Sequence, residues 1–397
     1  MNAYPQYLPY VAEQISYKTP RQIVKFLQPE QPVQCFSANA LMAQINLFKD
    51  NFPGKVTYAV KANPAKMVLK TAALAGIETF DVASINEMKQ VRNIAPDAIL
   101  HYHNPIRSRL EIKQAWQKYN CTRYAIDDLS ELKKLIDIID LTQTTAADIE
   151  IAVRFRLPAS GQSVHDFSEK FGQSPQAATH LLAQVKLYGF TPVLTFHPGS
   201  QCLDPQSWQQ HILVAAEIAQ NAKTQLTKLN VGGGFPVDYA NHRAPDLKQF
   251  FKIITDTTCH AFIGQDIPAL ECEPGRAIVA PSTSILTRVK MVREASYEVF
   301  INDGIYGNLM EASQASDLQA EARLIRKGNY HSSNLRPYTI YGPTCDPLDR
   351  LPSQIMLPQD IAEDDYIEFK HLGAYGSATA TSFNGYGQSA MIQVDHL

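Results

Sequence analysis

The feature that most constrains this chain is a repeated alternation between short apolar segments and amphipathic helical segments. Helical patterns such as AKMVLKTAALAG and DLSELKKLIDIID separate segments that are rich in apolar and β-branched residues. This alternation is typical of a parallel sheet built from βα units, and eight units predict a closed (β/α)8 barrel of the TIM type. The predicted strands cover residues 56–63, 77–84, 98–104, 122–127, 149–156, 193–200, 229–236 and 269–276.

The pattern changes after the eighth unit, where strand-like runs such as SYEVFIND and RPYTIYGPT are separated by turns. Such runs are typical of an antiparallel sheet. The chain has 397 residues, whereas a single hydrophobic core seldom grows beyond roughly 250–300 residues. We therefore predict a barrel over 38–278 and a mainly antiparallel β-domain over 279–397. An N-terminal segment over 1–37 should contribute in part to the β-domain, through its apolar stretch 32–37.

Composition and charge exclude several classes of partner. A net charge of -3 and a pI near 6.4 provide no electrostatic footprint for nucleic acid or anionic lipid. No apolar run approaches the roughly 18 residues that a membrane span needs. The six cysteines lack the spacing of a zinc site, which predicts free thiols and no metal. The N-terminus MNAYPQYLPYVAEQISYK lacks the regions of a secretory signal. We expect a cytoplasmic protein that acts on a small molecule.

A lysine stands at the end of the first predicted strand. In VTYAVKAN, Lys61 follows an apolar run, and burying a lysine is costly unless its charge is paired or its amine is used chemically. A side chain that extends to water is the plain alternative. The active site of a (β/α)8 barrel lies at the strand ends, because the βα loops gather there. Other polar residues stand at or just beyond predicted strand ends: Asp81, Glu87, His103, Asn104, Arg154, His197, Ser200, Gly232 to Gly234, Glu273 and Arg276.

These residue types suit pyridoxal phosphate. Its aldehyde needs a lysine, its phosphate needs N–H donors, and its pyridine nitrogen needs an acidic partner. The glycines in NVGGGFP expose backbone N–H groups that can surround a phosphate, although GGG also forms plain turns. Arg276 is a further phosphate donor or else the salt-bridge partner of Glu273. Glu273 is the candidate partner of the pyridine nitrogen. His197 either stacks on the ring or is a structural histidine.

Seven motifs, in this order, carry a family resemblance: YAVKANP, FDVASINEM, HPGSQ, GGGFP, EPGR, GPTCDPLDRL and GAYGSATATSFNGY. From residue 32 to the C-terminus, the chain resembles the fold type III pyridoxal-phosphate decarboxylases of basic amino acids, and most closely the ornithine decarboxylase group. The resemblance implies the alanine racemase-like fold of that family, which combines a (β/α)8 barrel with a β-domain.

The resemblance implies a role for each matching residue. Lys61 resembles the Schiff-base lysine, and Glu273 resembles the partner of the pyridine nitrogen. Asp81 and Glu87 resemble the acidic pair on the cofactor side of the site. The other implied cofactor contacts are Arg154 and His197 against the ring, and Ser200, Gly233, Gly234, Arg276 and Tyr375 at the phosphate.

GPTCDPLD bears most directly on the reaction. In the family, the matching cysteine and aspartate come from the β-domain of the neighbouring subunit, which implies a homodimer with two shared active sites. The resemblance implies that Cys345 protonates the α-carbon after CO2 leaves, and that Asp346 pairs with the distal ammonium of the substrate. Without the motif, the ordinary interpretation of Cys345 is a buried apolar thiol.

The implied reaction is the decarboxylation of ornithine or lysine to a diamine, as in polyamine biosynthesis. Tyr306 and Glu311 in NDGIYGNLMEASQASD are further substrate-binding candidates, with Asp317 as the alternative to Glu311. Other readings stay open. The same chemistry could act on diaminopimelate, carboxynorspermidine or a siderophore precursor. The chain could also be a non-catalytic regulatory homologue. An amino-acid racemase would need a catalytic tyrosine that nothing in the sequence places.

Overall fold

The computed structural model describes residues 17–142, 144–158, 163–165, 170–314, 318–328 and 330–397. The chain divides into two compact units. The barrel unit comprises the described residues of Gln44–Pro236 and Ala244–Ala277, and the β-unit comprises those from Tyr17 to Ala43, of Val237–Arg243 and of Ile278–Leu397. Within the described part of the chain, no helix has both the length and the apolar character needed to cross a membrane.

Parallel strands form the sheet of the barrel unit, in the order β2-β12-β11-β9-β7-β6-β5-β4-β3. Its two end segments, β2 (Gly54–Val56) and β3 (Tyr58–Ala59), are pieces of one stretch of chain that is interrupted at Thr57. Because β2 pairs with β12 and β3 pairs with β4, this stretch closes the sheet into a barrel. The eight predicted strands are confirmed, the first as two pieces. The others are β4 (Thr79–Val82), β5 (Ile99–Tyr102), β6 (Arg123–Ile126), β7 (Glu150–Arg154), β9 (Thr191–Thr195), β11 (Lys228–Asn230) and β12 (Ala269–Cys272).

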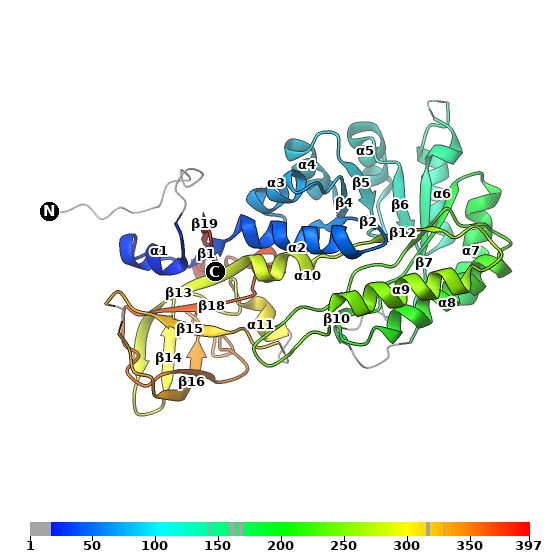
Figure 1. The fold of residues 1–397 in the computed structure, drawn as a ribbon. Coiled ribbons are helices and arrows are strands. Elements are labelled where there is room, and N and C mark those ends of the chain that lie inside the picture. Colours follow the sequence, from blue (N-terminus) through cyan, green and yellow to red (C-terminus); the bar gives the residue numbers. More distant parts are fainter. Residues whose placement is uncertain (1–16, 143, 159–162, 166–169, 315–317, 329) are drawn as a thin grey trace. The chain divides into compact units, whose positions relative to one another are not determined.

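Helices follow the strands and cover them (Figure 1). Ser84, Ser108 and Asp128 each come shortly after a strand and accept a backbone N–H from the first turn of the next helix. Such caps satisfy donors that the helix itself leaves unpaired. The helices therefore begin close to the carboxyl ends of these strands, where the polar residues gather. The barrel helices are α3 (Lys66–Leu74), α4 (Ile85–Ile94), α5 (Arg109–Tyr119), α6 (Leu129–Ile138), α7 (Pro175–Leu187), α8 (Gln206–Asn221) and α9 (Leu247–Ala261).

A mixed sheet forms the β-unit, with the path β15-β18-β13-β14-β16-β17 and with β1 paired to β13 and β19. Most neighbours are antiparallel, as predicted, but β14 with β16 and β1 with β19 are parallel. The predicted contribution of the stretch 32–37 is confirmed by β1 (Val33–Phe36). The other strands are β13 (Thr283–Arg293), β14 (Glu298–Ile301), β15 (Ala322–Ile325), β16 (Leu335–Tyr341), β17 (Ile355–Pro358), β18 (Tyr366–Phe369) and β19 (Ala390–Gln393).

The segment Val237–Arg243 belongs to the β-unit, although it lies between barrel strands in the sequence. The Tyr239 ring meets His371 edge-on at 6.3 Å, and His371 Nδ1 lies 2.6 Å from the carbonyl oxygen of Asp238. These contacts with His371 explain why the segment belongs to the β-unit. The remaining elements are α1 (Pro20–Phe26), α2 (Ala38–Asn51), η2 (Val60–Ala62), η3 (Ala146–Asp148), β8 (Ser163–His165), β10 (Ser200–Cys202), α10 (Arg276–Val279), η4 (Ala280–Ser282), α11 (Met310–Gln314), α12 (Gly376–Thr379) and η5 (Phe383–Gly385).

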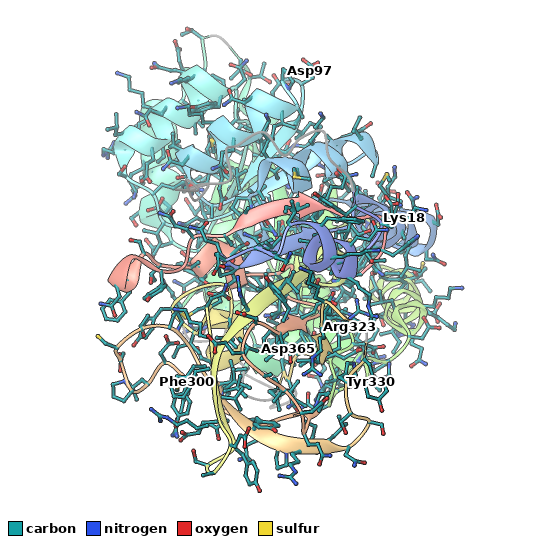
Figure 2. All side chains as sticks on the ribbon, turned by 90° about the vertical axis from the view of Figure 1, so that its left-hand side faces the viewer. Lys18, Asp97, Phe300, Arg323, Tyr330 and Asp365 are labelled. Carbon is teal, nitrogen blue, oxygen red and sulfur yellow. The ribbon has the colours of Figure 1, made fainter. Side chains whose placement is uncertain are left out.

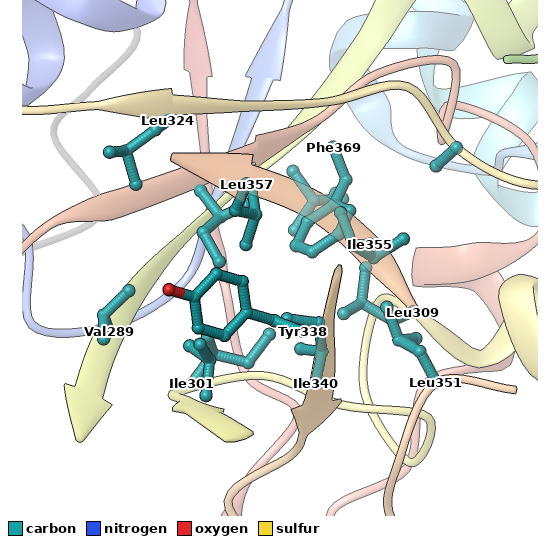
Figure 3. Packing of buried hydrophobic residues seen from close by; sticks show 14 of the residues in the cluster. Val289, Ile301, Leu309, Leu324, Tyr338, Ile340, Leu351, Ile355, Leu357 and Phe369 are labelled. Carbon is teal, nitrogen blue, oxygen red and sulfur yellow. The ribbon is translucent and has the colours of Figure 1, made fainter. Parts of the chain in front are cut away.

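The core of the β-unit is built from aliphatic side chains around Tyr338 (Figure 3). Leu309 and Leu351 belong to this cluster, so it anchors the loops after β14 and before β17. At the sheet, ion pairs supplement the apolar packing. Two of them involve residues labelled in Figure 2: Arg323 pairs with Glu368 at 2.5 Å, and Asp365 pairs with Arg326 at 2.7 Å.

Candidate active site

Lys61 lies in the 3-10 helix η2, directly after β3. The sequence left two alternatives for Lys61, a buried amine that is used chemically and a side chain that extends to water, and the side chain is exposed between buried Val60 and Ala62. The predicted strand continued to Asn63, but it ends at Ala59. The Tyr58 hydroxyl donates to the Asn63 carbonyl at 3.0 Å and fixes this turn. The charge of Lys61 lowers the pKa values of Asp81, Glu87 and Glu273, so the amine lies near these carboxylates.

Two carboxylates lie near this amine with different charge states. Asp81 is in β4 and Glu273 directly follows β12. Burial and the charge of Glu273 raise the pKa of Asp81 to about 7, against the lowering effect of His103 and Lys61. Burial alone would also raise the pKa of Glu273, but the charge of His103 and the hydrogen bonds from His103 and Asn230 hold it below its usual value. Glu273 is therefore the ionised member of the pair at neutral pH.

His103 is the partner of Glu273. Its Nδ1 forms an ion pair with Glu273 Oε1, and its ring stacks on His101 at 5.0 Å. The sequence singled out His103 as a polar strand-end residue without giving it a role. The available signal was the spacing in HYH, because residues two apart in a strand point to the same face. Arg276, the other partner considered for Glu273, donates from Nε to the Ser200 hydroxyl at 3.2 Å.

Arg154 and His197 add a cation and a neutral ring. Arg154 ends β7 and lies 5.7 Å from the centre of the Phe171 ring. His197 Nδ1 accepts the backbone N–H of Gly199 at 3.1 Å. Burial and the nearby charges of Lys61 and Arg154 hold the pKa of His197 well below its usual value. His197 is therefore a neutral imidazole at physiological pH, which suits a ring that packs on another ring.

The glycine loop after β11 has no room for side chains. Gly232 and Gly234 have φ values of +69° and +92°. A Cβ at Gly233 would lie 2.6 Å from the Glu273 carbonyl oxygen, and one at Gly234 would lie 2.2 Å from that of Gly199. Only glycine allows this close approach of backbone to backbone. Backbone N–H groups of this loop, together with the buried Ser200 and Arg276 side chains, form a donor set that suits a phosphate.

Glu87 has a second role besides the one predicted for it, which was to form an acidic pair with Asp81 on the cofactor side of the site. Its carboxylate accepts the backbone N–H of Ala83 at 2.6 Å, while the Ser84 hydroxyl accepts the N–H of Glu87. These bonds cap α4. Burial raises the pKa of Glu87, against the bond from Ala83 and the charge of Lys61. Glu87 therefore has a structural role at the start of α4 as well as a place near Lys61.

Three residues predicted to bind substrate or transfer a proton meet on loops of the β-unit. The Tyr306 hydroxyl donates to Asp346 Oδ2 at 2.5 Å, and this bond, with the N–H of Leu348, lowers the pKa of Asp346. The Cys345 thiol is exposed and lies 3.3 Å from Asn384 Oδ1. The buried apolar thiol considered for Cys345 is therefore excluded.

A residue that the sequence did not single out supports these loops. Asp349 is 1% exposed. Its carboxylate accepts the backbone N–H of Ile305 at 3.0 Å, and the N–H and hydroxyl of Thr344 at 3.0 and 2.7 Å. It thereby links the loop that carries Tyr306 to the loop that carries Cys345. Its place in GPTCDPLDRL was visible in the sequence, but its contacts were not.

Three predicted residues of the β-unit remain: Glu311, its alternative Asp317, and Tyr375. Glu311 lies in α11 and is 4% exposed. Its alternative, Asp317, lies outside the described residues. Tyr375 has a φ of +63° and precedes α12, where its carbonyl accepts the N–H of Thr379 at 2.9 Å.

The barrel mouth offers what pyridoxal phosphate requires. Lys61 is an exposed amine, Glu273 is an ionised acceptor, His197 is a neutral ring, and the glycine loop is a cradle that any Cβ would fill. These four features together suit an aldehyde with a phosphate and a basic ring nitrogen. The residues of this chain therefore fit pyridoxal phosphate.

Comparisons with known proteins point to one family. Residues 38–280 match the family described as "Pyridoxal-dependent decarboxylase, pyridoxal binding domain". The chain is 29% identical over 339 residues to the lysine/ornithine decarboxylase of Selenomonas ruminantium, with 83% of this chain and 81% of that protein covered. The solved lysine decarboxylase from Selenomonas ruminantium is similar with a TM-score of 0.81 at 26% identity, over 96% of this chain and 97% of the other. The lysine/ornithine decarboxylase from Vibrio vulnificus, solved with putrescine, is similar with a TM-score of 0.79 at 26% identity, over 94% and 96%.

Proposed function

Because the chain belongs to the pyridoxal-dependent decarboxylases, with pyridoxal 5'-phosphate as its cofactor, we propose that it converts an L-amino acid with a distal amino group, ornithine or lysine, to a diamine and CO2. The observation that carries the choice of substrate is the carboxylate of Asp346, which Tyr306 holds next to the exposed thiol of Cys345. An ionised carboxylate binds an ammonium well. The names of the similar proteins support the same class of substrate.

The barrel residues hold the cofactor in this proposal. Bound pyridoxal phosphate supplies an electron sink for the electrons that CO2 leaves behind. Lys61 holds the cofactor through its amine, and Glu273 accepts a hydrogen bond from the ring nitrogen. His197 and Arg154 lie against the ring, and Asp81 balances the charge of Lys61. The phosphate ligands are Ser200, Gly233, Gly234 and Arg276, with Tyr375 from the β-unit.

The β-unit supplies the substrate end. Asp346 pairs with the distal ammonium, and Tyr306 orients that carboxylate. Cys345 Sγ gives the proton to the α-carbon after CO2 has left. Glu311 is the further acidic candidate for the distal amine. The exposure of Cys345 and the partial exposure of Asp346 support this assignment, because a substrate must reach both.

We further propose that two copies of the chain form a homodimer in which Cys345 and Asp346 serve the neighbouring subunit's barrel, as the family resemblance implies. The six cysteines are all free, which supports a reducing compartment such as the cytoplasm.

The test is a substrate screen with the purified protein and pyridoxal phosphate. L-ornithine, L-lysine, meso-diaminopimelate and L-norleucine are incubated separately, and CO2 and the amine products are identified by mass spectrometry. We expect putrescine or cadaverine and negligible product from norleucine. Diaminopimelate as the preferred substrate, or no amine from any amino acid, would overturn the proposal.

A second arm of the test locates the cofactor. Borohydride reduction should fix the cofactor to Lys61, and Lys61→Ala should lose both the attachment and nearly all turnover. Lys70 is exposed in α3, so Lys70→Ala is the matched control and should keep both. Attachment to any lysine other than Lys61 would contradict the assignment.

A further inference from the structure

Glu273 is held from two sides by donors of its own barrel. Asn230 Nδ2 donates to Glu273 Oε1 at 2.5 Å, and His103 Nδ1 pairs with the same oxygen. Asn230 is itself fixed, because its Oδ1 accepts the backbone N–H of Gly232 at 2.9 Å. The side chains of His103 and Glu273 are only 9% and 11% exposed. Both donors reach Oε1, so Oε2 is the oxygen that could receive a further donor.

The His103 ring is held in place by a neutral neighbour. It stacks on the His101 ring at 5.0 Å and 27°. Arg123 Nη1 lies 2.8 Å from His101 Nε2, and since arginine can only donate, Nε2 must be an acceptor. Burial, together with the charges of His103 and Arg123, holds the pKa of His101 well below its usual value. His101 is therefore an uncharged platform for His103.

The charged groups around His103 favour its protonated form. Glu273 and Glu271 face it from β12 and its end, and Asp81 faces it from β4. Burial alone would lower the pKa of His103, but the charge and hydrogen bond of Glu273, followed by the charges of Asp81 and Glu271, raise it to about 9. Lys61 and Arg154 are further cations whose charges interact with Glu273 and Asp81. An imidazolium beside a carboxylate keeps that carboxylate ionised.

We propose that His103 is a positioning residue that keeps Glu273 ionised and oriented toward the ring nitrogen of the cofactor. This inference rests on the proposed role of Glu273. Without His103, Glu273 would be a buried carboxylate beside a second one, Asp81, and the two would share a proton as the pH falls. His103 thus sets the acid limit below which the cofactor nitrogen loses its ionised partner.

The first test measures cofactor binding without substrate. Cofactor-free wild type and His103→Ala are titrated with pyridoxal phosphate, and the dissociation constant is read from absorbance between about pH 6 and about pH 9. We expect His103→Ala to bind at least about tenfold more weakly near pH 6. The ratio of the two constants should approach one near pH 9, where His103 loses its own proton. The ionisations of the phosphate and of Lys61 are common to both proteins and cancel in the ratio.

Two variants separate the charge from the hydrogen bond. His103→Asn keeps a donor near the position of Nδ1 without the charge, so it should recover part of the loss near pH 6. His211 is the matched control, because it is a buried histidine of the same unit whose ring stacks on Phe196 at 4.7 Å. His211→Asn should leave the ratio independent of pH. A His103→Ala ratio that is the same at every pH would reduce His103 to a structural residue and overturn the proposal.

The second measurement needs no cofactor. In the nitrogen NMR spectrum of histidine-labelled, cofactor-free protein, His103 should carry both ring protons near neutral pH and should lose one in Glu273→Gln. A neutral His103 in the wild type would overturn the proposal. Binding of one metal ion per chain would also overturn the proposal, because His101, His103 and Glu273 have the spacing of metal ligands.

The Glu273→Gln variant distinguishes a failure of the proposed role of Glu273 from a failure of the inference about His103. If Glu273→Gln binds pyridoxal phosphate as tightly as the wild type, the proposed role of Glu273 is wrong, and the role of His103 falls with it. If Glu273→Gln binds weakly but His103→Ala does not, only the inference about His103 is wrong.

Discussion

At the scale of single residues, Asp349 organises the loops that carry the proposed substrate-binding residues. Its carboxylate takes three hydrogen bonds from Ile305 and Thr344. A Cβ at Gly304 or Gly342 would lie 2.1 or 2.2 Å from Asp349 Oδ1. The glycines and the aspartate therefore form one packed arrangement.

Asp349→Ala should lower both stability and activity. Loss of the carboxylate leaves buried N–H donors without an acceptor, which costs on the order of 2–4 kcal/mol of unfolding free energy. Turnover should also fall, because the loops of Tyr306 and Cys345 lose their link. Urea unfolding and steady-state kinetics measure the two effects. Asp256→Ala is the control, since Asp256 is 62% exposed in α9. Equal stabilities for the two variants would contradict the role of Asp349.

Tyr306→Phe should shift the acid limb of kcat/KM for lysine or ornithine to higher pH. The Tyr306 hydrogen bond lowers the pKa of Asp346, so its loss lets that pKa rise, and Asp346 becomes protonated at a higher pH. The loss relative to the wild type should be confined to pH values below about 5 and reach at most about twofold near pH 4, because the usual pKa of an aspartate is close to 4. Norleucine turnover should not show this shift, since it has no distal ammonium.

The control for this comparison is Tyr330→Phe, because the Tyr330 side chain is 82% exposed. An identical pH profile for Tyr306→Phe and Tyr330→Phe would show that Tyr306 does not act on Asp346.

The sequence identified many of the polar residues at the barrel mouth but not their contacts. Glu273 and His103 are 170 positions apart, and their pairing depends on how β5 and β12 are aligned around the barrel. The sequence could not decide between a buried and an exposed Lys61, because its exposure follows from the end of β3 at Ala59. Residue type and spacing therefore predicted which chemical groups the site contains, while the folded structure determines which of these groups form ion pairs.

At the scale of elements, the barrel strands carry charged side chains into the interior. Arg123 and Glu150 lie on the neighbouring strands β6 and β7, and Lys228 Nζ lies 2.6 Å from Glu150 Oε2. Glu271 on β12 is 2% exposed and lies 3.7 Å from His101. Apolar layers usually fill such barrels. This layer of charge should therefore make barrel stability depend on pH.

Glu271→Gln should stabilise the protein at pH 8 but not at pH 5. Burial is the main cause that raises the pKa of Glu271 to about 7 from 4.5. The folded state disfavours ionised Glu271. The free energy of unfolding therefore falls as the pH rises from the pKa of Glu271 in the unfolded chain toward its pKa in the folded protein, by at most on the order of 3 kcal/mol. Glutamine removes this loss. Urea unfolding at both pH values measures it, with exposed Glu217→Gln as control. A destabilised Glu271→Gln at pH 8 would mean that the Glu271 charge stabilises the fold.

Sequence periodicity predicted the strands and helices well, because apolar alternation and caps act locally. It did not predict the interruption at Thr57 or the parallel pair of β14 and β16. Thr57 donates its N–H to Cys272 at 2.9 Å, whereas the next residue, Tyr58, pairs with Phe80. This change of partner is set by barrel closure, which no local pattern encodes.

At the scale of the whole molecule, the proposed dimer predicts complementation. Lys61→Ala and Cys345→Ala would each abolish both sites of a dimer made of one variant alone. In a mixed dimer, one site receives both intact residues. Random mixing gives mixed dimers in half of the population, so activity should reach at most about a quarter of the wild type. Mixed dimers that are present by mass but remain inactive would show that each site is built within one chain.

The barrel is closed at β3 by a ladder of only two residue pairs. Only Tyr58 and Ala59 pair β3 with β4, whereas five residue pairs join β7 to β9. Lys61 and Asp81 stand on the two sides of this closure. A cofactor held by Lys61 would therefore resist local opening of the barrel there. Amide hydrogens of Tyr58 to Ala62 should exchange with solvent faster than those of β7 in the cofactor-free protein and slow markedly on binding, while those of β7 stay protected. In this sense the enzyme would complete its own fold when it binds pyridoxal phosphate.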